Sequence, residues 1–286
     1  MTAQLIDGNK LAAALREKIK KEVLSLPNPP GLAVILVGED PASSSYVRMK
    51  EKDCAEVGIQ SFPKHLPADT SEKELIKIIK QLNKNEHVNG ILAQLPLPEH
   101  INEKKIIANI LPEKDVDGLH ALNAGKLFLG ETNGLIPCTP KGVIEMIKTT
   151  GVALAGKRAV VIGRSNIVGK PVAILLLNEH CTVTICHSRT KDLGKVISEA
   201  DIVVAAIGRP RMITGEMIKA GAIVIDVGIN RVDGKLIGDV DFETAVQKAS
   251  FITPVPGGVG PMTRALLLEN TLLAQKNQAL EGHGNK

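Results

Sequence analysis

The chain has 286 residues and a formal net charge of +4, and 44% of its residues are hydrophobic while only 2% are aromatic. This length is enough for two domains of ordinary size with aliphatic cores. The scarcity of aromatic side chains argues against a base-stacking platform, and the lack of any run of five like charges argues against binding to nucleic acid or to an anionic membrane.

No apolar stretch is long enough for a transmembrane helix, and the first four residues do not resemble the start of a signal peptide. The cysteines form no C-x-x-C pair, and we expect free thiols in a reducing, cytoplasmic compartment. They are Cys54, Cys138, Cys181 and Cys186. His187 follows Cys186, but adjacent strand residues point to opposite faces, so no metal site is predicted.

In the first half of the chain, strands and helices alternate, which favours a parallel sheet. Continuous apolar runs predict buried strands at 32–37 and 90–95. Helices are predicted at 9–26, 45–57, 71–83 and 101–109. We expect the second helix to be capped by the serines at 43–45 and to end at Gly58. Residues 115–139 are rich in Gly, Asn and Pro and are predicted to be an irregular connection.

A second alternating series follows, beginning with a helix over 141–149. Strands are predicted at 158–162, 182–186, 201–205 and 222–227. Helices are predicted at 169–178, 191–199 and 214–219. This βαβαβ order is typical of the mononucleotide-binding half of a doubly wound sheet. We expect a loop over 251–261 and a last helix over 263–279, which returns to the first domain.

The segment RAVVIGRSNIVGKP at 158–171 combines an apolar strand, a glycine turn and a helix start, whose free N–H groups attract an anion. A nucleophile elbow is excluded because Ile167 occupies the place of its second glycine. A P-loop is excluded because five residues, not four, separate Gly163 from Gly169. The remaining interpretations are a dinucleotide turn in which Ser165 replaces a glycine, or a glycine-rich turn that binds nothing.

The ends of the later strands indicate which dinucleotide is bound. An NAD site places a carboxylate after the second strand, but the sequence there is HSRT at 187–190. Arg189 and two hydroxyls suit the 2′-phosphate of NADP, with Arg164 as a second cation. The alternative is a solvated polar turn. Gly208 and Ile229 follow the next two strands, at the edge where ligands bind.

Lys50 is the most unusual single residue, because it falls inside the apolar arc that Tyr46 and Cys54 form on the helix predicted over 45–57. A lysine on such a face can extend to solvent. The alternative is a lysine in a partly dry cleft, with a lowered pKa that lets it act as a base or proton relay. Gln94, near the end of the next buried strand, either orients Lys50 through its amide oxygen or caps that strand.

Two carboxylates, Asp115 and Asp117, occupy the turn DVDG at 115–118. A role in the turn alone accounts for both of them. The alternative is that one of them accepts hydrogen bonds from N–H groups of a ligand.

Seven segments, in order, resemble the bifunctional methylenetetrahydrofolate dehydrogenase/methenyltetrahydrofolate cyclohydrolase family. They are SSSYVRMK at 43–50, ILAQLPLP at 91–98, PEKDVDG at 112–118, PCTPKG at 137–142, GRSNIVGKP at 163–171, CHSRT at 186–190 and ITPVPGGVGPMT at 252–263. They span most of the chain, and the last is long and rarely found elsewhere, so the combination is highly specific.

The resemblance implies two α/β domains with a cleft between them. These are a catalytic folate-binding domain over 1–139, with the helix 263–286 packed back on it, and a Rossmann-type doubly wound NADP domain over 140–262. It implies NADP-dependent oxidation of 5,10-methylenetetrahydrofolate to the methenyl compound, and hydrolysis of the latter to 10-formyltetrahydrofolate. It also implies a homodimer formed through the NADP domains, which serves purine biosynthesis.

The resemblance further implies residue roles. Lys50 is the expected catalytic lysine, with Tyr46 stacked over the folate rings, Gln94 beside Lys50, and Asp117 on the pterin. The other expected folate residues are Leu95, Gly257, Gly258 and Pro261. The expected dinucleotide residues are Thr139, Gly163, Arg164, Ser165, Ile167, His187, Ser188, Arg189, Gly208 and Ile229. The alternatives are a dehydrogenase that lacks the cyclohydrolase activity and a folate- or NADP-binding protein without turnover. The intact set of Tyr46, Lys50, Gln94 and Asp117 argues against both.

Overall fold

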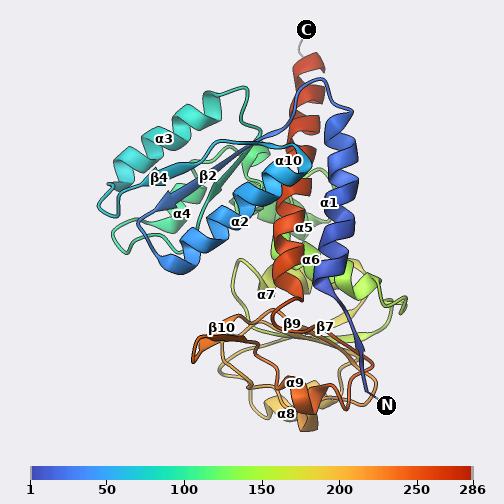
Figure 1. Ribbon diagram of the computed structural model, residues 1–286. Helices are drawn as coiled ribbons and strands as arrows, with labels where there is room; N and C mark the ends of the chain where they lie inside the picture. Colours follow the sequence, from blue (N-terminus) through green and yellow to red (C-terminus); the bar gives the residue numbers. More distant parts are fainter. Residues whose placement is uncertain (1, 285–286) are drawn as a thin grey trace. The chain divides into compact units, whose positions relative to one another are not determined.

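A computed structural model describes residues 2–284 and divides the chain into two compact units (Figure 1). Unit 1 comprises Met1–Ala12 and Thr139–Thr263, and unit 2 comprises Ala13–Cys138 and Arg264–Lys286. The first twelve residues therefore belong with the second half of the chain and not with the N-terminal domain in which the sequence placed them. The reason is that strand β1 (Gln4–Leu5) pairs in parallel with β12 (Phe251–Ile252).

Unit 1 is built on a six-stranded sheet in the order β1-β12-β9-β8-β6-β7, and every pairing in it is parallel. Four of its strands are β6 (Arg158–Ile162), β7 (Thr182–Cys186), β8 (Ile202–Ala205) and β9 (Ile223–Asp226), and β7 lies at one edge. The inner strands β6, β8 and β9 are largely apolar because both faces of such a sheet are covered, whereas the edge strand β7 is mostly exposed. All of β8 and β9 is buried, and Val160, Val203 and Val224 belong to one core cluster.

The connections of unit 1 include α6 (Cys138–Lys148), α7 (Gly169–Asn178), α8 (Leu193–Ser198) and α9 (Phe242–Ala245). The helix predicted over 214–219 is only a three-residue 3-10 turn, η2 (Gly215–Met217). Part of the loop predicted over 251–261 is strand β12. The antiparallel hairpin β10 (Asn230–Val232) and β11 (Lys235–Ile237) has no predicted counterpart.

Unit 2 is built around β2 (Gly31–Val37), all of whose residues are buried. One edge of β2 pairs with β5 (Gly90–Ala93), and the other pairs first with β3 (Gln60–Ser61) and then with β4 (Lys64–Leu66), always in parallel. Ala33, Ile35 and Val37 pack with the apolar face of α3 (Glu72–Lys84) in one core cluster. In Figure 1, α2 (Pro41–Val57) and α3 lie on either side of these strands.

The remaining helices of unit 2 are α4 (Glu103–Ile107), the 3-10 turn η1 (Pro112–Lys114) and α5 (Ala121–Leu129). Most of α1 (Gly8–Leu24) and α10 (Val259–Gly284) also belongs to this unit. Within unit 2 these two helices are joined by an ion pair between Lys276 and Glu22. Helix α5 corrects the prediction that 115–139 is irregular throughout.

Helix α2 begins earlier than predicted. Asp40, not a serine of 43–45, is its N-cap, and the Asp40 carboxylate accepts a 2.7 Å hydrogen bond from the Ser43 N–H. Pro41 suits the first helical position because its missing N–H would have no partner there. The predicted end at Gly58 is confirmed, since this residue adopts the left-handed conformation with φ of 83°.

Over residues 2–284, no helix has both the length and the apolar character that crossing a bilayer requires. Within the same residues, no three side chains of His, Cys, Asp or Glu gather as a metal ion would need. The cysteines at 54, 138, 181 and 186 are free and buried.

Candidate functional site

Lys50 and Gln94 meet in unit 2 beside the carboxyl ends of parallel strands. Lys50 belongs to α2, which follows β2, and Gln94 directly follows β5. The Lys50 Nζ donates a 2.8 Å hydrogen bond to the Gln94 Oε1. The Gln94 Nε2 donates in turn to the carbonyl oxygen of Leu95 at 2.7 Å. Because the Gln94 amide nitrogen already has a partner, its oxygen is fixed toward Lys50. Of the two roles predicted for Gln94, the structure therefore favours the one in which its amide oxygen orients Lys50.

The surroundings of Lys50 favour its neutral form. Burial lowers the pKa of Lys50, the negative charge of Asp117 opposes that shift, and the positive charge of Arg264 adds to it. An amine with a lowered pKa is available as a base closer to neutral pH than an exposed lysine.

The two carboxylates of the 115–118 turn have different roles. Asp115 is buried, and its carboxylate accepts hydrogen bonds from the His120 N–H at 2.7 Å and the Asn123 Nδ2 at 2.9 Å. Burial raises the pKa of Asp115 to about 7. Burial also raises the pKa of Asp117, while the charge of Lys50 opposes that shift. Asp115 thus holds the turn, and Asp117 faces the lysine electrostatically.

Other predicted residues of unit 2 flank this pair. Tyr46 lies one helical turn before Lys50 on α2 and is half-buried, as is Leu95. Sequence reasoning missed Arg264, whose Nε lies 2.9 Å from the Oδ2 of the largely buried Asp53 on α2. Nothing in the local sequence pairs an arginine of α10 with an aspartate so distant in the chain.

In unit 1, the glycine turn connects β6 to α7 as predicted. Gly163 has φ of 125°, and a Cβ at this position would lie 2.1 Å from the carbonyl oxygen of Ala206. The Ser165 Oγ accepts hydrogen bonds from the Val168 and Gly169 N–H groups, at 3.2 and 3.3 Å. Arg164, Ser165 and Ile167 are exposed. The turn therefore combines a helix N-terminus, a cation and a close backbone approach, which fits a dinucleotide phosphate.

The segment 187–190 is a closed turn after β7. The His187 N–H donates to the Thr190 Oγ1 at 2.9 Å, so this hydroxyl takes part in closing the turn. Ser188 and Arg189 are exposed. A cation and a hydroxyl beside the strand end remain suited to a 2′-phosphate.

Gly208 and Ile229 are exposed after β8 and β9, at the same edge of the sheet. The hydroxyls of Thr139 and Thr263 are 2.9 Å apart, also in unit 1. Gly257, Gly258 and Pro261 belong to unit 1 as well, whereas Tyr46, Lys50, Gln94 and Asp117 belong to unit 2. The residues expected to bind the folate are therefore divided between the two units.

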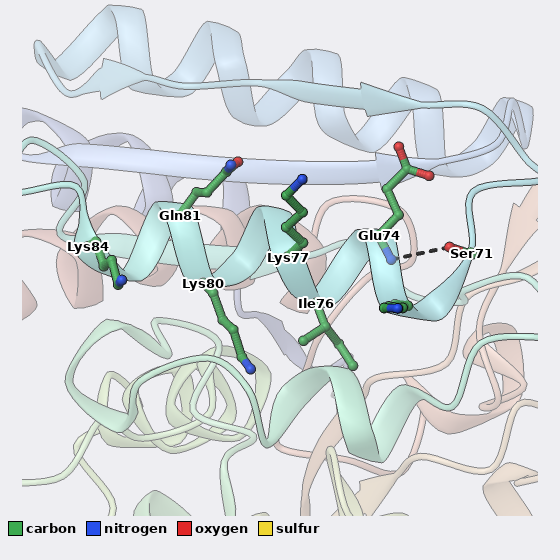
Figure 2. A pocket seen from close by; sticks show the side chains of 8 residues that line it. Ser71, Glu74, Ile76, Lys77, Lys80, Gln81 and Lys84 are labelled. Carbon is green, nitrogen blue, oxygen red and sulfur yellow. Dashed lines mark hydrogen bonds between the residues drawn. The ribbon is translucent and has the colours of Figure 1, made fainter.

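Figure 2 shows a hollow along α3 that is unrelated to these residues. It is lined by Ser71, Lys73, Glu74, Ile76, Lys77, Lys80, Gln81 and Lys84. Lys77 and Lys80 extend to opposite sides of the helix in Figure 2, so the lysines do not converge on one point. The opposite face of α3 buries Leu75, Ile79 and Leu82. The hollow is the solvated face of an amphipathic helix.

A Rossmann-type unit with a glycine turn, and a second α/β unit that holds a desolvated lysine, define a two-unit α/β dehydrogenase. The family model of the tetrahydrofolate dehydrogenase/cyclohydrolase catalytic domain matches residues 6–117. The model of the NAD(P)-binding domain of the same family matches residues 137–279. The chain belongs to this tetrahydrofolate dehydrogenase/cyclohydrolase family.

Relatives and solved structures agree with this assignment. The "Bifunctional protein FolD" of Halothermothrix orenii is 57% identical over 277 residues, which cover 96% of this chain and 98% of that protein. The crystal structure of the bifunctional FolD enzyme from Campylobacter jejuni matches with a TM-score of 0.95 at 48% identity, over 96% of this chain and 99% of that one. The Trypanosoma brucei enzyme, solved with NADP and an inhibitor, matches with a TM-score of 0.94 at 42% identity, over 98% and 99%.

Proposed function

We propose that Lys50, oriented by Gln94, is the proton-transfer group of a bifunctional folate enzyme. The chain is an NADP-dependent methylenetetrahydrofolate dehydrogenase and methenyltetrahydrofolate cyclohydrolase. It oxidises 5,10-methylenetetrahydrofolate and hydrolyses the methenyl product to 10-formyltetrahydrofolate. The observation that carries the residue assignment is the 2.8 Å hydrogen bond from the Lys50 Nζ to Gln94, at a lysine whose pKa is lowered.

The oxidation requires alignment more than acid–base chemistry. A hydride leaves the one-carbon bridge between N5 and N10 of the folate, and the bridge becomes a delocalised cation. When bound, NADP accepts this hydride. The task of the protein is to hold the two reactants in line, which requires no proton transfer from Lys50. Tyr46 supports the alignment, because a half-buried aromatic ring one helical turn from Lys50 offers a flat surface to the folate rings.

The hydrolysis requires proton transfer. Water adds to the cationic carbon and loses a proton, which gives a neutral hydroxyl adduct. The bond from this carbon to N5 then breaks, N5 takes up a proton, and the hydroxyl loses its proton to become the formyl oxygen on N10, so that one proton is released overall. Neutral Lys50 accepts the proton from the attacking water, and Gln94 fixes the direction of its amine. The positive charge of the methenyl substrate also favours the neutral lysine by like-charge repulsion. One lysine thus serves the second step without disturbing the first.

Asp117 selects the ring system in this proposal. Its carboxylate accepts hydrogen bonds from the pterin N–H groups, and a ring without these donors would leave a partly buried carboxylate unpaired. Leu95 is a further proposed folate residue of unit 2, and Gly257, Gly258 and Pro261 are the proposed folate residues of unit 1.

NADP binding is proposed for the strand-end loops of unit 1. The N-terminus of α7 and Ser165 serve the phosphates, and Ser188 and Arg189 serve the 2′-phosphate, with Arg164 as a second cation. Thr139, Gly163, Ile167, His187, Gly208 and Ile229 complete this proposed site. Exposure of both arginines beside strand ends supports the assignment.

A spectrophotometric assay tests the function. The chain is supplied with methylenetetrahydrofolate and either NADP or NAD. Reduced cofactor that forms with NADP, without matching accumulation of the methenyl compound, supports both activities. Matching accumulation would leave only the dehydrogenase, and no turnover in folded protein would leave only a binding role.

Three further expectations remain predictions: the homodimer through the NADP unit, the cytoplasmic location and the role in purine biosynthesis. Sedimentation equilibrium of the purified chain checks the first. A mass of one chain at micromolar concentration would contradict it.

A further inference from the structure

Two buried aspartates of unit 1, Asp226 and Asp239, have no part in the chemistry described above. Asp226 ends β9 and is 4% exposed, and Asp239 follows β11 and is 0% exposed. Among residues 2–284, neither carboxylate has an ion-pair partner within 4.0 Å. A buried charge without a cation is costly unless N–H groups surround it, so the hydrogen bonds of this pair require an explanation.

The Asp239 carboxylate accepts hydrogen bonds from the backbone of residues 207–209, the loop after β8. Its Oδ2 accepts from the N–H groups of Ile207 at 2.6 Å and of Gly208 at 3.0 Å, and its Oδ1 accepts from that of Arg209 at 2.9 Å. Three successive N–H groups that donate to one buried carboxylate hold the backbone of this loop in place. They are also unavailable to a phosphate, so the loop offers a ligand its outer side only.

The same carboxylate reaches the loop after β9. The Asn230 Nδ2 donates to the Asp239 Oδ1 at 2.9 Å. Gly228 lies against Asp239 so closely that a Cβ at this position would be 2.3 Å from the Asp239 Cγ. Ile229, between these two residues, is a proposed dinucleotide residue, as is Gly208 in the other loop.

Asp226 holds Asp239 in place. Its Oδ1 accepts from the N–H groups of Gly228 and of Asp239, both at 2.9 Å, and its Oδ2 accepts from that of Val240 at 2.8 Å. The strand β9 thus fixes the segment 239–240, and this segment fixes the loop 207–209.

We propose that Asp239, anchored by Asp226, is a positioning residue that locks the loops after β8 and β9 in the arrangement that binds the dinucleotide. The proposal rests on the proposed function, because it takes Gly208 and Ile229 as dinucleotide residues. It assigns no role in proton or hydride transfer to either aspartate.

The test is the Asp239→Asn variant, in which one oxygen that accepts N–H groups becomes an N–H donor. The dissociation constant of NADP, measured by calorimetry, is expected to rise about tenfold or more. The KM for NADP rises with it, while kcat at saturating NADP and hydrolysis of the methenyl compound, which uses no dinucleotide, stay within about twofold of the parent chain.

Asp201→Asn is the matched control. Asp201 precedes the same strand β8 at its opposite end, accepts a 2.9 Å hydrogen bond from the Arg158 N–H and pairs with Lys219 at 2.6 Å. Its substitution removes a carboxylate from the same sheet, and we expect NADP affinity to stay within about twofold. An equal loss of NADP affinity in both variants would show general loosening of the unit and would overturn the positioning role.

Unchanged NADP affinity in folded Asp239→Asn protein also overturns the proposal. If this variant does not fold, Asn230→Ala takes its place, because it removes the Nδ2 that donates to the Asp239 Oδ1 and to the Ile237 carbonyl oxygen. Unchanged NADP affinity there overturns the role of Asp239 in holding the loop after β9. Calorimetry of the parent chain measures NADP binding without turnover, so failure of this proposal can be distinguished from failure of the proposed function. A parent chain that binds NADP without turnover contradicts the proposed function alone, and one that does not bind NADP contradicts both.

Discussion

The lysine site of unit 2 and the glycine turn of unit 1 differ in the chemical groups that form them. The first consists of side chains: the Lys50 Nζ donates to Gln94, the charges of Lys50 and Asp117 influence each other, and burial shifts the pKa of both charged members. The second consists mainly of backbone, at a turn where Gly163 leaves no room for a side chain. Proton transfer needs a titratable group in a shaped environment, whereas phosphate binding needs oriented N–H groups. The first site should therefore fail when a side chain is removed, and the second when one is added.

The largest effect is expected at Lys50. Lys50→Met removes the amine and keeps the apolar stem, so hydrolysis of the methenyl compound should fall about a thousandfold. NADP and folate should still bind, and Lys52→Met, at an exposed position of the same helix, should leave the rate unchanged. Stopped-flow absorbance measures the hydrolysis. In the parent chain this rate should rise with pH as Lys50 loses its proton; full hydrolysis by Lys50→Met would remove the lysine from the mechanism.

Gly163→Ala tests the glycine turn of unit 1, because it adds a single methyl group to the backbone there. The new Cβ would lie 2.1 Å from the Ala206 oxygen, and the φ of 125° is unfavourable for alanine. NADP affinity should weaken about a hundredfold, the upper end of the cost of overpacking.

Gly151→Ala is the control for Gly163→Ala. Gly151 also has positive φ, 71°, but has nothing within 4 Å of the added group. Calorimetric titration with NADP compares the two variants. Equal affinities would show that close packing of the turn is not what the dinucleotide requires.

Arg189→Ala tests how much a side chain contributes to NADP binding in unit 1, where the proposed phosphate site consists mainly of backbone. Loss of a charge-assisted contact to the 2′-phosphate should weaken NADP binding about tenfold and NAD binding hardly at all. Lys191→Ala, an exposed cation two residues further on, serves as the control. Competition between NADP and NAD measures the preference. An equal loss for both dinucleotides would reject the phosphate role.

The last effect is on stability and not on activity, and it concerns Asp115, the carboxylate that holds the turn beside the lysine site. Because the pKa of Asp115 is about 7 in the folded chain, against 3.8 for a free carboxyl, the folded state binds more protons than the unfolded state between these values. This group therefore lowers the free energy of unfolding as pH rises from about 4 to about 7, by at most about 1.4 kcal/mol per pH unit.

Asp115→Asn should remove that slope. Urea denaturation at pH 5 and pH 8 measures it, with Asp69→Asn as an exposed control. Parallel pH profiles in the parent chain and Asp115→Asn would contradict the assigned shift.

Patterns with strong local causes were predictable from the sequence. Helix α7 was predicted at its observed bounds because a glycine turn precedes it and an apolar run fills it. Helix α5 was missed because its large side chains Leu122, Phe128 and Leu129 are exposed, so they produce no inward apolar stripe. Strands of two or three residues, such as β3 and β4, are too short for a periodic signal.

The same distinction holds within the proposed sites. Lys50 was noticeable because a charge on an apolar arc conflicts with its neighbours. Asp239 and Asp226 were not, since an aspartate next to a glycine, as Asp239 is to Gly238, or two residues before one, as Asp226 is to Gly228, is typical of an ordinary turn. Only the tertiary structure shows that these carboxylates are buried and which N–H groups converge on them.

The division of the chain also has a consequence for its synthesis. Neither unit is a continuous stretch: unit 1 begins with Met1–Ala12 and resumes at Thr139, and unit 2 resumes at Arg264. Strand β1 leaves the ribosome early, yet its partner β12 lies at Phe251–Ile252. The nascent chain therefore cannot pair β1 with β12 until almost all of the chain has been translated.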